Sequence, residues 1–330
     1  MYFLRAIGFS YLHLKIKQLY HLPEGCSGLP ESVFYQPMTL IPANEVNIWY
    51  QRMEQATKDP DFLLKAAQDT VLDMTLPAHR WFFSGADLAS TIRRINYGFS
   101  SVQSGCSMVG AQVGPILKWI YRNPQIQTEM KVHDGIRMAT FMLKVLREYL
   151  GEHFAPMRVL LPGKRDNRNK YCDYFGCEVD WNQPRVEIWF HANHRLATQM
   201  QHRPKAKSLA MRYQELDDFL NMPDPTDEHK VVYETINYAC HYGYPTLERV
   251  SLLLGLSTQQ FQRRLHGFGM SFSIVMGYVL SNMAVNLLSR KVPIEEVARR
   301  LGYQHVASFN RMFKKQRGVT PSQYCQRFEE

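Results

Sequence analysis

The fold is decided by residues 245–321, which contain two similar units. The first unit, residues 246–268, reads TLERVSLLLGLSTQQFQRRLHGF. Its apolar stripe at helical spacing consists of Leu247, Val250 and Leu254. Gly255 permits a tight reversal, and Ser257 with Gln260 three residues later forms a capping box for the next helix. That second helix is predicted to bury Phe261, Leu265 and Phe268.

The second unit, residues 293–324, repeats the pattern as PIEEVARRLGYQHVASFNRMFKKQRGVTPSQY. Pro293 is predicted at the first helical position, where the missing N–H of proline costs nothing. A further capping box, Thr320 with Gln323, begins a closing helix. The aromatic residues expected to face the core, one turn apart, are Phe309 and Phe313.

A long helix is predicted between the two units. Its apolar residues at helical spacing are Phe272, Val275, Met276, Val279, Met283 and Leu287. A helix of about twenty residues spans roughly 30 Å, and successive major-groove faces of B-DNA lie roughly 34 Å apart. The second helices of the two units could therefore enter adjacent grooves of double-stranded DNA as parts of one chain.

These residues resemble the DNA-binding domain of the AraC/XylS family of bacterial transcription regulators. The resemblance covers about the last hundred residues and is most specific over residues 294–324. Its base-reading or flanking positions are implied at Gln259, Gln262 and Arg263 in the first unit and at Gln304, Val306, Ala307, Asn310 and Arg311 in the second. The chain departs from the family at Leu280, where the connecting helix usually carries arginine, so the geometry or phosphate contact of that helix is expected to differ.

Side-chain chemistry supports these positions unequally. Arg263 and Arg311 can form bidentate contacts with guanine, and Gln262 with adenine. Val306 and Ala307 could contact only a thymine methyl group, so the second recognition helix is expected to read less sequence. The predicted DNA-binding residues are Gln259, Gln262, Arg263, His266, Gln304, Asn310, Arg311, Lys314 and Lys315.

One such helix pair alone would not identify DNA binding, because helix pairs joined by a glycine turn are common in all-helical proteins. Two units at this spacing, with basic outward faces, favour DNA. The basic residues that we expect to be solvated, paired with Glu295 and Glu296, or at most in contact with phosphate are Arg264, Lys291, Arg299 and Arg300.

Composition is compatible with this interpretation. The chain has 330 residues, long enough for two domains, and a net charge of +9. Residues 226–330 contain 13 Lys and Arg against 8 Asp and Glu, so both parts are basic and the smaller part more densely. The charge favours nucleic acid without proving it, because basic proteins also meet membranes and acidic partners.

We predict no membrane span, metal site or cofactor. No run approaches eighteen apolar residues, and charged residues interrupt the apolar start of the chain, which has no signal-peptide cleavage site. The six cysteines contain no CxxC pair. The set that comes nearest to a zinc site is Cys172, Cys177, His191 and His194, but its spacing is not a common ligand pattern. Reduced thiols in a cytoplasmic protein are the simpler interpretation.

Residues 1–200 are predicted to form an α+β domain. Its clearest helices and strands are expected over residues 88–99, 132–150, 158–161 and 186–190. Residues 201–226 are predicted as a linker containing a short helix over 210–220 and ending in a proline cluster. Residues 227–330 form the predicted all-α domain with the two helix-turn-helix units.

The N-terminal part resembles, more diffusely, the arabinose-binding-type domain attached to some members of the same family, through residues 172–179 and 186–190. The resemblance implies a small-molecule sensor and a dimerisation surface. Its many aromatic side chains could line an apolar pocket, although packing in an ordinary core is the more common arrangement. An anionic effector would find a cation at Arg93, Arg94 or Lys118.

Two local features carry further expectations. Residues 81–83, Trp-Phe-Phe, cannot all face inward on a regular element, so one of them is expected to be exposed. The basic loop over residues 163–170 could meet DNA or the other domain, but a solvated surface loop is the more common alternative.

We therefore expect a cytoplasmic, sequence-specific transcription regulator, more an activator than a repressor, in which a small-molecule effector alters DNA binding. Its expected partners are double-stranded DNA, RNA polymerase and a second copy of the chain. Two alternatives stay open. The N-terminal half could be an effector-free dimerisation or partner-docking module. The chain could also be a DNA-repair methyl acceptor, although no Pro-Cys-His-Arg string supports the required thiolate.

Overall fold

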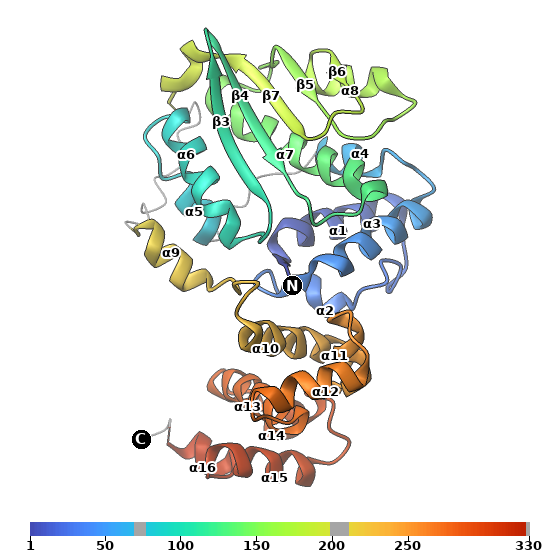
Figure 1. Cartoon of the computed structure of the whole chain (residues 1–330), viewed down its shortest axis with the longest axis vertical. Coiled ribbons are helices and arrows are strands. Elements are labelled where there is room, and N and C mark those ends of the chain that lie inside the picture. Colours follow the sequence, from blue (N-terminus) through green and yellow to red (C-terminus); the bar gives the residue numbers. More distant parts are fainter. Residues whose placement is uncertain (69–76, 199–210, 328–330) are drawn as a thin grey trace. The chain divides into compact units, whose positions relative to one another are not determined.

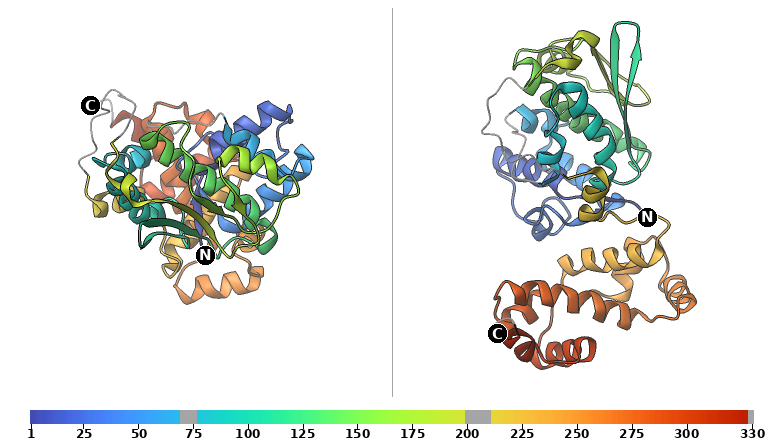
Figure 2. Two further views of the ribbon diagram at one scale, coloured as in Figure 1. Left: turned by 90° about the horizontal axis from the view of Figure 1, so that it is seen from above. Right: turned by 90° about the vertical axis from the view of Figure 1, so that its left-hand side faces the viewer.

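The computed structural model describes residues 1–68, 77–198 and 211–327. The chain divides into two compact units, one of residues 2–222 and one of residues 223–330 together with Met1. The division therefore falls within the segment expected to be a linker. Figures 1 and 2 show the elements of each unit.

The N-terminal unit contains a five-stranded sheet with the order β3-β4-β7-β5-β6 (Figure 1). All neighbouring strands are antiparallel except β5 and β6, which are parallel. The strands are β3 (Ser107–Val113), β4 (Ile116–Arg122), β5 (Arg158–Leu160), β6 (Val179–Asp180) and β7 (Val186–His191). The strands predicted over residues 158–161 and 186–190 are thus confirmed.

The same unit contains a series of helices. They are α1 (Ile7–Tyr20), α2 (Glu31–Phe34), α3 (Ala43–Thr57), α4 (Phe62–Gln68), α5 (Pro77–Phe82), α6 (Leu88–Gly98), α7 (Lys131–Leu150), α8 (Arg168–Phe175) and α9 (Tyr213–Leu220). Helix α7 packs against β7, and α6 packs against β3. Both helices were predicted from their apolar stripes, and α6 begins with a capping box formed by Asp87 and Ser90.

The apolar start of the chain packs into the N-terminal unit. Strand β1 (Phe3–Arg5) pairs antiparallel with β2 (Leu40–Pro42) in a separate two-stranded sheet. Phe3 and Leu4 are almost completely buried. The hydrophobicity of β1 is therefore accounted for by burial in the core.

The expectation that one residue of the Trp-Phe-Phe run is exposed is wrong. Trp81, Phe82 and Phe83 are all buried. Helix α5 ends at Phe82. Phe83 therefore lies outside the helix, and its side chain need not follow the helical period that would direct it toward solvent. The indole Nε1 of Trp81 donates a hydrogen bond to the backbone oxygen of Met211 at 2.7 Å, so the polar edge of the ring is also satisfied.

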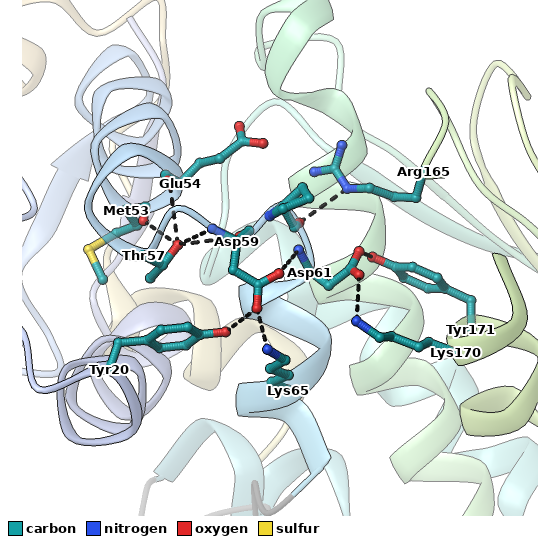
Figure 3. A network of polar contacts seen from close by, with 11 residues as sticks. Tyr20, Met53, Glu54, Thr57, Asp59, Asp61, Lys65, Arg165, Lys170 and Tyr171 are labelled. Carbon is teal, nitrogen blue, oxygen red and sulfur yellow. Dashed lines mark hydrogen bonds and ion pairs between the residues drawn. The ribbon is translucent and has the colours of Figure 1, made fainter. Parts of the chain in front are cut away.

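The basic loop over residues 163–170 is anchored to its own unit, as Figure 3 shows. Arg165 donates a hydrogen bond to the backbone oxygen of Pro60 at 3.1 Å. The Asp61 carboxylate accepts from Lys170 at 3.2 Å and from the Tyr171 hydroxyl at 2.7 Å. These contacts tie the loop and α8 to the turn between α3 and α4, which favours a structural role for both basic residues.

The C-terminal unit is all helical in its described part. Its helices are α10 (Glu228–Ala239), α11 (Leu247–Leu253), α12 (Thr258–Gly267), α13 (Phe272–Ser289), α14 (Ile294–Arg300), α15 (Val306–Arg317) and α16 (Pro321–Gln326). One core cluster joins the second half of the unit and consists of Cys240, Leu280, Ala284, Leu288, Val297, Ala298, Leu301, Phe309 and Phe313. The closing helix begins at the predicted Thr320–Gln323 capping box.

Two details of the prediction were wrong. Pro293 is the N-cap of α14, one position before the helix, because its ψ of 143° is extended. Phe268 is half-buried and follows the end of α12.

Among the described residues, α13 is the helix long and apolar enough to suit a membrane span. The side chains of Val279 and Leu280 on α13 are completely buried in this unit.

Candidate nucleic-acid interface

The first helix-turn-helix unit consists of α11, a short turn and α12. The Ser257 hydroxyl accepts from the Gln260 backbone N–H at 3.2 Å, and the Gln260 side chain accepts from the Ser257 N–H at 2.8 Å. The predicted capping box is therefore confirmed. Gly255 occupies the turn with φ +68°, a conformation that favours glycine.

The buried stripe of this unit differs slightly from the predicted one. Val250 and Leu253 are buried, whereas Leu247 and Leu254 are half-buried. On the second helix, Phe261 and Leu265 form the buried face as predicted. The stripe is rotated by one residue on α11 because the partner helices, and not the sequence repeat alone, select the face that is covered.

The outward face of α12 is open. Gln259, Gln262, Arg263 and His266 are all exposed. Among the described residues, Arg263 has no hydrogen-bond or ion-pair partner. The neighbouring Arg264 lies 3.5 Å from the Glu228 carboxylate. Arg263 is thus free to meet a ligand, and Arg264 is already paired, though with a different glutamate from those predicted.

The second helix-turn-helix unit consists of α14, a turn at Gly302 and α15. Gly302 has φ +80°, and a Cβ atom there would lie 2.4 Å from the backbone nitrogen of Tyr244. Such an approach is impossible without a shift of the backbone, so this turn requires glycine. Phe309 and Phe313 are completely buried, as predicted.

The outward face of α15 is only partly open. Gln304, Arg311, Lys314 and Lys315 are exposed. The Arg311 guanidinium donates a hydrogen bond to the Ser308 hydroxyl at 3.3 Å. Asn310 is half-buried, and its Oδ1 is enclosed without a hydrogen-bond partner among the described residues. The oxygen of Asn310 therefore points into the protein and not toward a base.

The two arginines of α14 form ion pairs within the same helix. Arg299 and Arg300 both lie 2.7 Å from the Glu296 carboxylate. Hydrogen bonds from these two guanidinium groups lower the pKa of Glu296 to about 2. The predicted pairing of Arg299 and Arg300 with Glu296 is confirmed. These two arginines therefore differ from Arg263, which has no ion-pair partner among the described residues.

Leu280, the departure from the family pattern, is completely buried on α13 within the core cluster. An apolar side chain at this position packs against the second unit. It offers no charge for a DNA phosphate. The difference therefore lies in the core of the domain and leaves the helix order unchanged.

Two of the candidate cations for an anionic effector in the N-terminal unit lie over tryptophan rings. The Arg94 guanidinium stacks 4.8 Å from the Trp81 ring centroid, and the Lys118 ammonium lies 3.9 Å from that of Trp189. Arg93 is exposed. Large aromatic side chains such as Trp49 and Trp119 are core residues, each 1% exposed.

A buried cation on another helix was missed. Arg137 is 7% exposed and lies on the buried face of α7, one turn after the equally buried Asp134. Both charges lie on the side of this helix opposite its predicted apolar stripe, which a sequence pattern assigns to solvent, so the helical repeat carried no signal for their burial.

Cys172 lies on α8, and Cys177 follows its end. No group of three or more His, Cys, Asp or Glu side chains suited to a metal is present among the residues that the structure describes.

Comparisons with known proteins agree with this layout. A family model described as the arabinose-binding domain of AraC transcription regulator, N-terminal, matches residues 25–197, just over half of the chain. A helix-turn-helix domain model matches residues 251–327. The first model is described as part of a transcription regulator.

Curated relatives match a shorter region. Uncharacterised HTH-type transcriptional regulators of Mycobacterium bovis and Mycobacterium tuberculosis are each 36% identical over 85 residues, which is 26% of this chain. The match spans 25% of the length of each relative.

A solved structure aligns along most of the chain. The crystal structure of the transcriptional regulator CdpR from Pseudomonas aeruginosa aligns over 97% of this chain and 98% of its own, with 16% identity and a TM-score of 0.47. That similarity supports no inference about activity. With the matches to the two family models, the two-unit layout and the tandem helix-turn-helix geometry, the chain belongs to the AraC family of transcription regulators.

Proposed function

We propose that this protein binds a specific double-stranded DNA site through both recognition helices, α12 and α15, and thereby regulates transcription. The observation that carries this proposal is the pair of helix-turn-helix units with basic outward faces at the two ends of α13. At 18 residues, that helix spans about 27 Å at 1.5 Å per residue. This length is close to the repeat of successive major-groove faces, roughly 34 Å.

The two recognition helices have different roles in this proposal. Exposed Gln262 and unpartnered Arg263 on α12 have the donor geometry for adenine and guanine edges. On α15, Arg311 is the exposed side chain suited to guanine, while Lys314 and Lys315 supply charge for phosphate. We propose Gln259, His266 and Gln304 as flanking contacts, and for Asn310 a contact through its amide nitrogen alone, because its Oδ1 is enclosed.

Regulation completes the proposal. In this proposal the N-terminal unit binds a small-molecule effector. The protein is a cytoplasmic homodimer that acts as an activator and contacts RNA polymerase. The connection supports coupling between units, because α9 belongs to the N-terminal unit and ends two residues before its boundary at Met222. An effector that binds one arrangement of that unit more tightly would shift DNA affinity.

The test begins with selection of bound duplexes from a random pool by the full-length protein. Gel-shift titrations then compare the selected site with a scrambled site for the wild type, Arg263→Ala, Arg311→Ala and the double variant. The proposal predicts a selected consensus and progressive loss of preference in the variants. Unchanged site-specific binding by the double variant would overturn the assignment of the two recognition helices.

A further inference from the structure

The N-terminal unit contains an apolar cavity of about 190 Å³ between its first helix and α7. Its walls come from α1, α7, β1 and the segment after α6. Representative apolar lining residues are Ile7, Phe9, Phe82, Phe99, Met138 and Phe141. None of the aromatic residues that line it is a tryptophan, and Phe82 is the lining residue that comes from the Trp-Phe-Phe run.

One buried cation lines this cavity and is held in a fixed position. The Arg137 guanidinium donates from Nε to the Tyr50 hydroxyl at 3.0 Å. Its Nη2 donates to Gln103 Oε1 at 2.9 Å and to Asp134 Oδ1 at 2.7 Å. The guanidinium carbon also lies 4.7 Å from the Phe9 ring centroid. Two nitrogens and one face of the group are therefore occupied.

The third nitrogen of Arg137, Nη1, has no hydrogen-bond partner among the described residues. It faces Gly8 on α1, where a Cβ atom would lie 3.5 Å away and would meet no other heavy atom within 4 Å. Both residues line the cavity. The missing side chain at Gly8 thus leaves space directly beside an unpaired guanidinium nitrogen.

The charge around the cavity is positive. Arg5, Arg137 and Lys144 line it, and no Asp or Glu occurs among the described lining residues. The nearest buried carboxylate, Asp134, already accepts hydrogen bonds from Tyr50, Tyr121 and Asn123 besides Arg137. Since these neutral donors share the charge of Asp134, Arg137 retains a positive potential at its free nitrogen.

We propose that this cavity binds a small monocarboxylate, whose carboxylate accepts a hydrogen bond from Arg137 Nη1 and whose apolar part contacts the phenylalanines. A cavity of about 150 Å³ lined by apolar side chains holds one benzene molecule, so the ligand is a short alkyl or single-ring acid. That this ligand is the effector of DNA binding rests on the function proposed above. Charge-assisted hydrogen bonds to guanidinium select an acid over its amide.

A second lining residue connects the cavity to α9. Arg5, 5% exposed, donates to the backbone oxygens of Met38 at 2.7 Å and Ser101 at 3.3 Å, and also to that of Leu220. Leu220 is the last residue of α9. A ligand that moves β1 would therefore displace the end of the helix that leads out of this unit.

Isothermal titration of the full-length protein tests the site directly. The probes are hexanoate and 3-phenylpropionate, with hexanamide and 3-phenylpropanamide as uncharged analogues. We expect one bound acid per chain and at least about tenfold weaker binding of the amide. Equal affinity for acid and amide, or no binding of either acid, would overturn the proposal.

Matched variants locate the binding site. Gly8→Leu fills the space beside Nη1 and removes none of the hydrogen bonds of Arg137, so it is expected to abolish acid binding while the protein stays folded. Arg137→Lys is expected to weaken acid binding at least about tenfold. Lys118→Gln removes a cation elsewhere in the same unit and should leave binding unchanged. Acid binding that survives Gly8→Leu but is lost in Lys118→Gln would place the site elsewhere and overturn the assignment.

Gel-shift titration of the same preparations separates this proposal from the function on which it rests. A change in DNA affinity on adding acid, absent in Gly8→Leu, supports both. Acid binding without any DNA binding would support the cavity and contradict the proposed regulator function. Intact site-specific DNA binding that no acid alters, in protein that binds acid, would overturn the effector role.

Discussion

The two helix-turn-helix units share one pattern but differ in how firmly they are packed and how freely they present side chains. The first turns at Gly255, where an added Cβ would meet no heavy atom within 4 Å. The second turns at Gly302, where it would strike the Tyr244 backbone. The second unit also shares the core cluster with α13, and its arginines on α14 are paired with Glu296.

This difference indicates that the two units have different roles in DNA binding. The first unit presents a capped recognition helix with an unpartnered Arg263, whereas the second is held tightly and presents Arg311 beside Ser308. A rigid second unit suits anchoring on the phosphate backbone, and an open first unit suits reading of bases. The comparison leads to four predictions.

The largest effect is expected in the core of the second unit. Leu280→Arg, which places the family's usual residue on α13, buries an unpaired charge and should destabilise the C-terminal unit by at least about 3 kcal/mol. Ile274→Arg on the same helix is the control, because Ile274 is 52% exposed, and it should change stability by about 0.5 kcal/mol or less. Urea unfolding of the full-length proteins measures both. Equal stability of the two variants would contradict the burial of Leu280.

The two turn glycines should respond unequally. Gly302→Ala combines a left-handed backbone with a backbone clash and should cost about 2–4 kcal/mol, whereas Gly255→Ala meets backbone strain alone and should cost about 1 kcal/mol. Scanning calorimetry of each variant checks the order. If the costs were equal or reversed, the tighter packing of the second unit would be refuted.

The recognition helices should differ in binding free energy. Arg263→Ala is expected to cost about 1–3 kcal/mol at the selected site and to relax preference at one base pair. Arg311→Ala should cost less, because this arginine already has a partner in Ser308. Gel-shift titrations against sites substituted at each position measure both effects, with paired Arg264→Ala as the control. A larger loss for Arg311→Ala would reverse the assigned roles.

The smallest effect is expected from the lysines of α15. Lys314→Ala and Lys315→Ala should weaken binding to selected and scrambled duplexes alike, and each should reduce the salt slope by about one. Arg299→Ala should leave the slope unchanged, because Glu296 already holds Arg299. Titrations at several salt concentrations report the slope. A loss confined to the selected site would show that these lysines read bases.

The sequence predicted the features of the interface that depend on neighbouring residues. The Ser257–Gln260 and Thr320–Gln323 capping boxes occur as expected, because the chemistry of a cap is contained within four residues. The helix boundaries and the connecting helix follow from apolar repeats for the same reason. Leu253 replaced Leu254 in the buried stripe because the choice depends on which helix lies opposite.

Features that depend on contacts between distant segments were not predictable. The cavity requires Gly8 on α1 to face Arg137 on α7, and Arg137 to be held by Gln103 and Tyr50. No repeat or local motif in the sequence links these positions. The same reason explains the Trp-Phe-Phe run, where all three rings are buried because the helix ends before the third.

Methylation protection of guanine N7 on a selected duplex tests most directly whether both recognition helices contact one face of the DNA. N7 lies in the major groove, where arginine contacts guanine. The wild type should protect two clusters of guanines about one helical turn, or about 10 base pairs, apart on the same face. Arg263→Ala should lose one cluster and Arg311→Ala the other. A single protected cluster, or two clusters on opposite faces of the duplex, would contradict the central claim.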